Sequence, residues 1–142
     1  MPIPKKIKII LDKAEDKLKS AQILFDNGQW SDSVSRAYYG VFHAISAVLL
    51  TRELTFSSHA QTISAFNREF IKTNLFPKEF GRYITKIETD REVGDYRIIA
   101  FITEEVAKED LSVAKRIYAI CHQFLEQLYS QDKEGNIEKS SY

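Results

Sequence analysis

The stretch SDSVSRAYYGVFHAISAVLLTR, residues 31–52, decides the fold class of this chain. Its apolar residues recur every three or four positions, as on one side of an α-helix. They are Val34, Ala37, Tyr38, Val41, Ile45, Val48 and Leu49. No stretch of the chain alternates convincingly between apolar and polar residues, which is the pattern of a half-buried strand. The sequence therefore predicts an all-α protein.

Further helices are predicted on both sides of this stretch. One covers residues 5–26 and ends at Asn27-Gly28, and Ser31 or Asp32 caps the next. Because the connection is short, these two helices should pack as an antiparallel hairpin. The buried side of the first helix is expected to contain Ile9, Ala14, Leu18, Ala21, Ile23 and Leu24.

The remaining helices are expected over residues 59–73, 78–92 and 103–129. A serine caps the first of them, Thr103 caps the last, and Gly94-Asp95-Tyr96 interrupts the chain after the middle one. The fold class is thus a bundle of helices. It forms one domain over residues 1–130, and the polar residues 131–142 are predicted to be a flexible tail.

Charge and composition narrow the function. The 20 basic residues balance 20 acidic ones, so no global field directs the chain to nucleic acid, and any RNA binding must be local. The longest apolar run, residues 41–50, is about half of what spans a bilayer, and we expect a soluble, cytoplasmic protein. No metal-ligand spacing or phosphate loop is present, so we expect neither a metal nor a cofactor.

A second, polar stripe runs along the helix of residues 31–52. Arg36, Tyr39 and His43 are spaced by three and four residues, so they share one helix face and extend over about 10 Å. Arginine is a permanent bidentate donor and histidine exchanges a proton near neutral pH, so the stripe is a plausible phosphate site. The alternative is that these residues are partly buried packing residues with satisfied hydrogen bonds.

Three motifs resemble those of small prokaryotic members of the HEPN superfamily (higher eukaryotes and prokaryotes nucleotide-binding). They are Ala37-Tyr38-Tyr39-Gly40-Val41-Phe42-His43, then Ser58-His59-Ala60, then Arg91-Glu92-Val93-Gly94-Asp95-Tyr96. The resemblance implies an up-and-down antiparallel bundle of four to five helices, usually a homodimer. Such proteins are often paired with a minimal nucleotidyltransferase as a toxin and its antitoxin.

The resemblance also implies roles for particular residues. Many HEPN proteins are metal-independent endoribonucleases with an arginine, four to six residues and then a histidine. Arg36 and His43, with six residues between them, would be the catalytic pair. Tyr39 and His59 would bind substrate or nucleotide, and Arg91, Asp95 and Tyr96 would form a structural latch, in which Asp95 could pair with Arg91 or with Arg36.

This chain departs from the ribonuclease pattern in ways that leave alternatives open. The motif lies in the second helix, Ala37 follows the arginine, and Ile45 stands where some members have a tyrosine that the antitoxin modifies. Arg116 and His122 form a rival pair, although 600° of helical rotation places them on different faces. The main alternative function is a non-catalytic module that binds a nucleotide or a partner protein; a polar dimer interface is a third.

Overall fold

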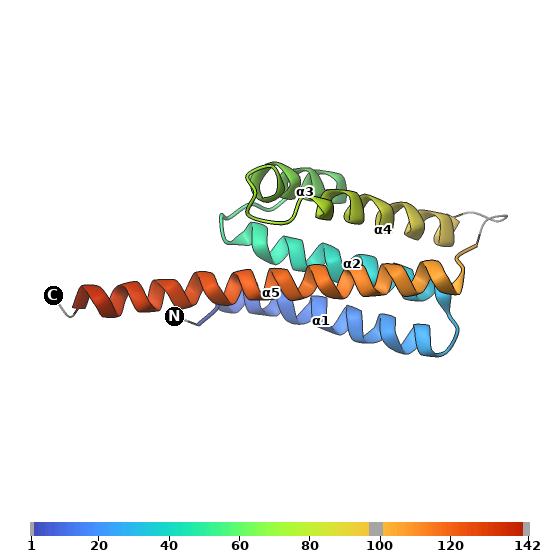
Figure 1. The fold of residues 1–142 in the computed structure, drawn as a ribbon, viewed down its shortest axis with the longest axis horizontal. Helices are drawn as coiled ribbons and strands as arrows, with labels where there is room; N and C mark the ends of the chain where they lie inside the picture. Colours follow the sequence, from blue (N-terminus) through green and yellow to red (C-terminus); the bar gives the residue numbers. More distant parts are fainter. Residues whose placement is uncertain (1, 97–100, 141–142) are drawn as a thin grey trace.

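The computed structural model describes residues 2–96 and 101–140, without the side chains of residue 96 and of residues 131–140. It contains α1 (Lys5–Asp26), α2 (Trp30–Leu50), α3 (His59–Phe66), a π-helix η1 (Asn67–Ile71), α4 (Glu79–Tyr96) and α5 (Glu104–Ser140). The part of the chain so described has no strand. The predicted all-α bundle is therefore confirmed (Figure 1).

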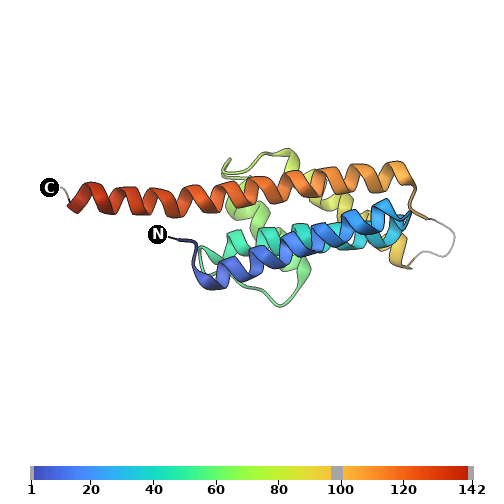
Figure 2. The same cartoon turned by 90° about the horizontal axis from the view of Figure 1, so that it is seen from below.

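Helix α2 is the centre of the bundle. It contacts α1, α3, α4 and α5, and it lies between the side formed by α3 and α4 and the side formed by α1 and α5 (Figures 1 and 2). All seven of its predicted apolar positions are buried. The C-terminal part of α5 extends past the ends of the other helices. Among the described helices, none is both long enough and apolar enough to cross a membrane.

The predicted hairpin of α1 and α2 is present, and its turn has the expected residues. Asn27 ends α1, and Gly28 has a φ of +74°, a conformation in which glycine is favoured. The Ser33 hydroxyl donates a buried hydrogen bond of 2.8 Å to the carbonyl of Ala21, which ties the two helices together.

The predicted start of α2 is wrong. Neither Ser31 nor Asp32 caps it; the N-cap is Gln29, which makes no side-chain cap hydrogen bond, and the helix begins at Trp30. The Trp30 ring packs on Phe25 of α1 with 5.1 Å between ring centroids. Aromatic packing across the turn, together with the bond from the Ser33 amide to the Gln29 carbonyl, therefore sets the helix start.

The buried side of α1 is narrower than predicted. Ile9 and Ile23 are 48% and 61% exposed, whereas Ile7, Leu11, Ala14, Leu18 and Ala21 are buried. These five residues are spaced by four and three, so they form one stripe facing α2 and α5. Ile9 lies about 200° around the helix from Ile7, which places it outside that stripe.

The close contact between α1 and α2 depends on Gly40. A Cβ atom built there would meet Leu18 Cδ2 at 2.6 Å and Leu18 Cγ at 2.8 Å. No other residue type fits without movement of Leu18. Gly40 lies inside the polar stripe of α2, so the same helix turn packs against α1 and carries the candidate site.

Helices α3 and α4 agree with the predictions except at Gly94. Ser58 caps α3 by accepting a 3.1 Å bond from the Gln61 amide. The predicted interruption after residue 92 is wrong, because α4 continues to Tyr96. A Cβ at Gly94 would lie 3.2 Å from Ser31 and from Ile102, so this glycine serves close packing and not a chain turn.

Helix α5 starts as predicted and continues further than predicted. Thr103 Oγ1 accepts a 3.2 Å bond from the Val106 amide and caps the helix. The helix was expected to end near Tyr129, but its backbone is helical to Ser140. Glutamine, lysine and glutamate, which occur in residues 131–140, are good helix formers, and a polar helix leaves no apolar periodicity to read. The predicted flexible tail, residues 131–142, falls on residues whose side chains the structure does not describe.

Candidate functional site

A pocket of about 650 Å³ opens on the polar stripe of α2. The structure brings together in it four of the residues singled out from the sequence: Arg36, Tyr39 and His43 from α2, and His59 from the first position of α3. The other lining residues are Lys17, Leu24, Asp32, Ser35 and Phe42. The stripe therefore faces an open pocket, although Tyr39 also packs, partly buried, against the hydrophobic core.

His43 is half-buried in this pocket, and its pKa is lowered below the ordinary value of 6.5. Burial is the largest cause, because the charged imidazolium loses hydration. The positive charges of Lys13 and Lys17 on α1 add to it, followed by His59. His43 is thus neutral at neutral pH, and in this form its unprotonated ring nitrogen can accept a proton or a hydrogen bond.

Arg36 differs from His43 in being exposed. Asp32 lines the same pocket one helical turn away, yet among the described residues no ion pair of Arg36 is found. Its guanidinium can therefore offer paired N–H donors and a full charge to an anion in the pocket.

His59 is held by contacts with α2. The Tyr38 hydroxyl lies 3.0 Å from His59 Nδ1, and the Phe42 ring lies 4.1 Å from the imidazole, centroid to centroid. Burial raises the pKa of Tyr38 to about 12, so the phenol keeps its proton and can donate to Nδ1. When it does, the proton of a neutral His59 is on Nε2. Tyr38 and Phe42, two residues of the Ala37–His43 motif (the tyrosine motif), therefore orient the His59 imidazole.

Arg91 supports the tyrosines from α4. Its guanidinium carbon lies 4.6 Å from the Tyr38 ring centroid and 5.7 Å from that of Tyr39, which is cation–π geometry. Asp95 lies 3.7 Å from Arg91 one turn further along α4. Of the two partners suggested for Asp95, the structure records the ion pair with Arg91. The side chain of Tyr96 lies outside the described residues.

Arg116 and His122, the rival pair, have ion-pair partners outside the pocket. Arg116 Nη2 is 3.2 Å from Glu79 on α4, and His122 Nε2 is 3.2 Å from Glu126 on α5 itself. Neither lines the pocket. No group of three or more His, Cys, Asp or Glu side chains within reach of one metal ion occurs in the described part of the chain.

Lys17 and Phe42 contribute to the site but were not predicted. Lys17 lowers the pKa of His43, and Phe42 stacks on His59. Phe42 belongs to the tyrosine motif and could have been placed with the stripe by its spacing of three from Tyr39. Lys17 could have been found only from the register of the α1–α2 hairpin, which the packing of Gly40 on Leu18 sets.

The fold and site define a class, an all-α bundle that presents a cation and two imidazoles in one surface pocket. The chain belongs to the HEPN domain family, whose model matches residues 7–127. A Thermotoga maritima protein named as a UPF0332 protein is 34% identical over 116 residues, 82% of this chain and 88% of that one.

Two further relatives are of comparable similarity. A Gloeobacter violaceus protein, UPF0332 protein glr0978, is 33% identical over 119 residues, 83% of this chain and 94% of its own. A Methanocaldococcus jannaschii protein named "Putative toxin MJ0605" is 38% identical over 94 residues, 66% of this chain and 70% of its own. The predicted membership of the HEPN family is confirmed.

Proposed function

We propose that this protein is a toxin-like HEPN protein that cleaves RNA without a metal ion, with Arg36 and His43 as the catalytic pair. The observation that carries the proposal is the convergence of Arg36, His43 and His59 on one pocket, where His43 has a lowered pKa. The toxin name of the Methanocaldococcus jannaschii relative supports the biological role.

The chemistry follows from the states of the side chains. Neutral His43 takes the proton of a ribose 2′-hydroxyl, and the 2′-oxygen attacks the adjacent phosphorus. Arg36 stabilises the negative charge that grows on the phosphoryl oxygens. The 5′-oxygen leaves and takes the proton from the His43 imidazolium formed in the first step, so the products are a 2′,3′-cyclic phosphate and a 5′-hydroxyl. His59, oriented by Tyr38, and Tyr39 would position the phosphate.

The proposal includes an assembly. A homodimer that faced two such pockets toward each other would form one cleft with two Arg–His pairs, and a cytoplasmic minimal nucleotidyltransferase would be the antitoxin. Both parts rest on the family resemblance. Sedimentation velocity of the pure protein tests the first, because a monomer at working concentrations contradicts a shared cleft.

The alternative is a non-catalytic module that binds a nucleotide or partner in the same pocket. The absence of a described ion pair at Arg36 favours it equally, since a free guanidinium binds a phosphate whether or not bonds change. It predicts that substitutions of Arg36 and His43 alter binding and not turnover.

The deciding experiment uses two histidine variants of matched chemistry. Purified wild-type protein, His43→Ala and His122→Ala are incubated with mixed cellular RNA and EDTA, and products are resolved on a denaturing gel. We expect cleavage by the wild type and by His122→Ala, and a loss of roughly 100-fold or more for His43→Ala. Equal cleavage by all three would refute the assignment, and no cleavage by any would favour the binding module.

A further inference from the structure

A second groove, of about 870 Å³, lies between the α3–η1 segment and α4, and it shares no lining residue with the candidate site. Four of the residues that line it are cations: Arg68, Lys72, Arg82 and Lys86. No carboxylate lines it. In a chain whose charges cancel overall, this is a local excess of positive charge.

The four cations come from two facing helix surfaces. Arg68 and Lys72 are four residues apart at η1, and Arg82 and Lys86 are four residues apart on α4, so each pair projects from one side of its segment. Gly81 also lines the groove, and a Cβ there would lie 3.4 Å from Asn67 Oδ1. The absence of a side chain at Gly81 therefore helps to keep the groove open.

Two of these cations have no carboxylate partner. Within the described residues Lys72 and Arg82 form no ion pair, whereas Lys86 contacts Asp90 at 2.8 Å and Asp110 at 3.0 Å. Arg82 instead lies over the Tyr83 ring, with its guanidinium carbon 5.4 Å from the centroid. An aromatic ring holds a guanidinium in place without neutralising it, so Arg82 keeps its charge for a ligand.

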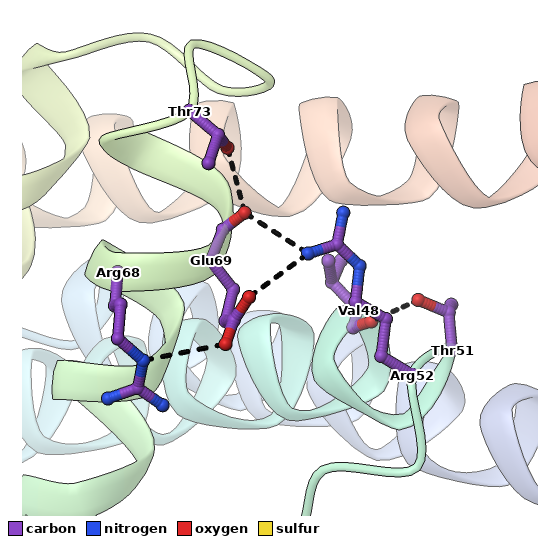
Figure 3. A network of polar contacts seen from close by, with 6 residues as sticks. All are labelled: Val48, Thr51, Arg52, Arg68, Glu69 and Thr73. Atoms are coloured by element: carbon purple, nitrogen blue, oxygen red, sulfur yellow. Dashed lines mark hydrogen bonds and ion pairs between the residues drawn. The ribbon is translucent and has the colours of Figure 1, made fainter.

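Arg68 is only partly committed to the protein (Figure 3). Its Nε lies 3.4 Å from Glu69 Oε1, while Arg52 lies 3.3 Å from Glu69 Oε2. Glu69 is thus shared between two arginines, and its carbonyl also accepts bonds from Arg52 and Thr73. The terminal nitrogens of Arg68 have no recorded partner among the described residues, so they are available in the groove.

An unpaired polar atom also lies at the groove. Asn67 Oδ1 is buried and has no hydrogen-bond partner in the described structure, and Asn67 lines the groove. A buried amide oxygen without a partner is costly, and because this oxygen is shielded from solvent, a ligand donor gains that free energy only if the Asn67 side chain turns toward the groove. Ribose hydroxyls and base amino groups supply such donors, whereas a glutamate or aspartate side chain does not.

The groove is connected to the candidate site along α3. A shallow hollow shares Phe42 with the candidate site, and a second hollow shares Phe56 with the first and Arg68 with the groove. Phe56 is 37% exposed between them and offers an aromatic face. A strand bound in the groove could therefore pass Phe56 and reach His59 and His43.

From these observations we propose that the groove between η1 and α4 binds the phosphate backbone of single-stranded RNA outside the pocket of Arg36 and His43. The proposal rests on the proposed function for the identity of the ligand. Cations without carboxylates and a neighbouring exposed aromatic are the components of sequence-tolerant single-strand binding. An acidic protein segment would use the cations, but its carboxylates provide no planar base to stack on Phe56.

The test measures binding with an RNA that cannot be cleaved. A fluorescent 2′-O-methyl oligonucleotide of about 12 nucleotides is titrated with full-length protein at several salt concentrations. The groove variant is Lys72→Ala with Arg82→Ala, and the matched control is Lys78→Ala with Lys108→Ala. The control lysines are exposed, line none of the pockets described above, and change the net charge by the same amount.

We expect the groove variant to bind at least roughly tenfold more weakly, and its slope of log affinity against log salt to fall by about 1.4. Each cation paired with a single-strand phosphate contributes about 0.7 to that slope. The control should change neither by a comparable amount. Equal affinity and slope for the groove variant and the wild type overturn the proposal, and so does a wild type that binds no RNA at low salt.

Two further outcomes separate the proposals. Because the probe has no 2′-hydroxyl, it measures RNA binding through the groove whether or not the protein cleaves RNA. Binding that depends on the groove in a wild type that cleaves no RNA would assign the groove to a non-catalytic module. If a polyglutamate peptide of equal charge binds the groove as tightly as the RNA, an acidic protein partner replaces RNA as the ligand and the proposal is wrong.

Discussion

Gly40 tests how the packing of α1 supports the candidate site. Replacement by alanine has two opposite effects on stability. Alanine in a helix interior is favoured over glycine by about 1 kcal/mol. Its Cβ, however, would lie 2.6 Å from Leu18 Cδ2 and 2.8 Å from Cγ, far inside contact distance. Leu18 is buried, so it can yield only by an unfavourable rotamer or by a shift of α1.

Overpacking of this kind costs about 1 to 3 kcal/mol, and the contacts of 2.6 Å and 2.8 Å with the buried Leu18 place the cost in the upper part of that range, above the gain in propensity. We therefore expect Gly40→Ala to lower the free energy of unfolding by roughly 1 to 2 kcal/mol, measured by urea denaturation with circular dichroism. A shift of α1 would also move Lys17, so the pKa of His43 should rise toward its ordinary value.

Gly81→Ala is the matched control. Gly81 is also helical, but a Cβ there meets only Asn67 Oδ1, at 3.4 Å. Its stability should rise by up to about 1 kcal/mol, through propensity alone. A Gly40→Ala protein that is as stable as the wild type would refute the packing argument. A Leu18→Ala, Gly40→Ala double variant should be less destabilised than the two single effects added together, because they share the clash.

Three further predictions concern titration and hydrogen bonding. Lys13→Gln with Lys17→Gln should raise the pKa of His43 in an NMR titration but leave it below 6.5, since burial is the larger cause; an unchanged pKa would contradict the assigned charges. Tyr38→Phe removes the hydroxyl bonded to His59 and should lower the free energy of unfolding, measured by urea denaturation, by about 0.5 to 1.5 kcal/mol. A smaller change would contradict a stabilising Tyr38–His59 hydrogen bond. Burial and Asp90 raise the pKa of Asp110 from 3.8 to about 7, so the folded chain holds the Asp110 proton more strongly than the unfolded chain does. The free energy of unfolding of the wild type, relative to that of Asp110→Asn, should therefore fall on the order of 1 kcal/mol between about pH 5 and pH 7. A parallel pH dependence of both proteins would disprove this prediction.

The predictions from sequence succeeded where a single helix determines the answer. The face of α2 that carries Arg36, Tyr39 and His43 follows from 3.6 residues per turn, whatever packs around it. The caps at Ser58 and Thr103 were likewise found, because a cap is a bond between residues three positions apart. These are local features with local causes.

Two of the errors occurred where a distant element decides. Gly94 has the composition of a break, but the proximity of Ser31 and Ile102 makes it a packing contact within α4. Ile9 and Ile23 have the hydropathy of core residues, but α2 and α5 cover only the stripe from Ile7 to Ala21. Hydropathy says which residues can be buried, and neighbouring helices determine which of them are.

The sequence by itself determined the helical class, the hairpin and the polar stripe, because helical periodicity, the Asn27-Gly28 stop and the tyrosine motif are written in consecutive residues. Only the tertiary structure decided that His59 joins that stripe, that Lys17 lowers the pKa of His43, that Arg91 lies against the tyrosines, and that four cations gather between η1 and α4. Each of these depends on the distance between side chains of different helices, which is set by how the helices pack and not by the spacing of residues along one of them.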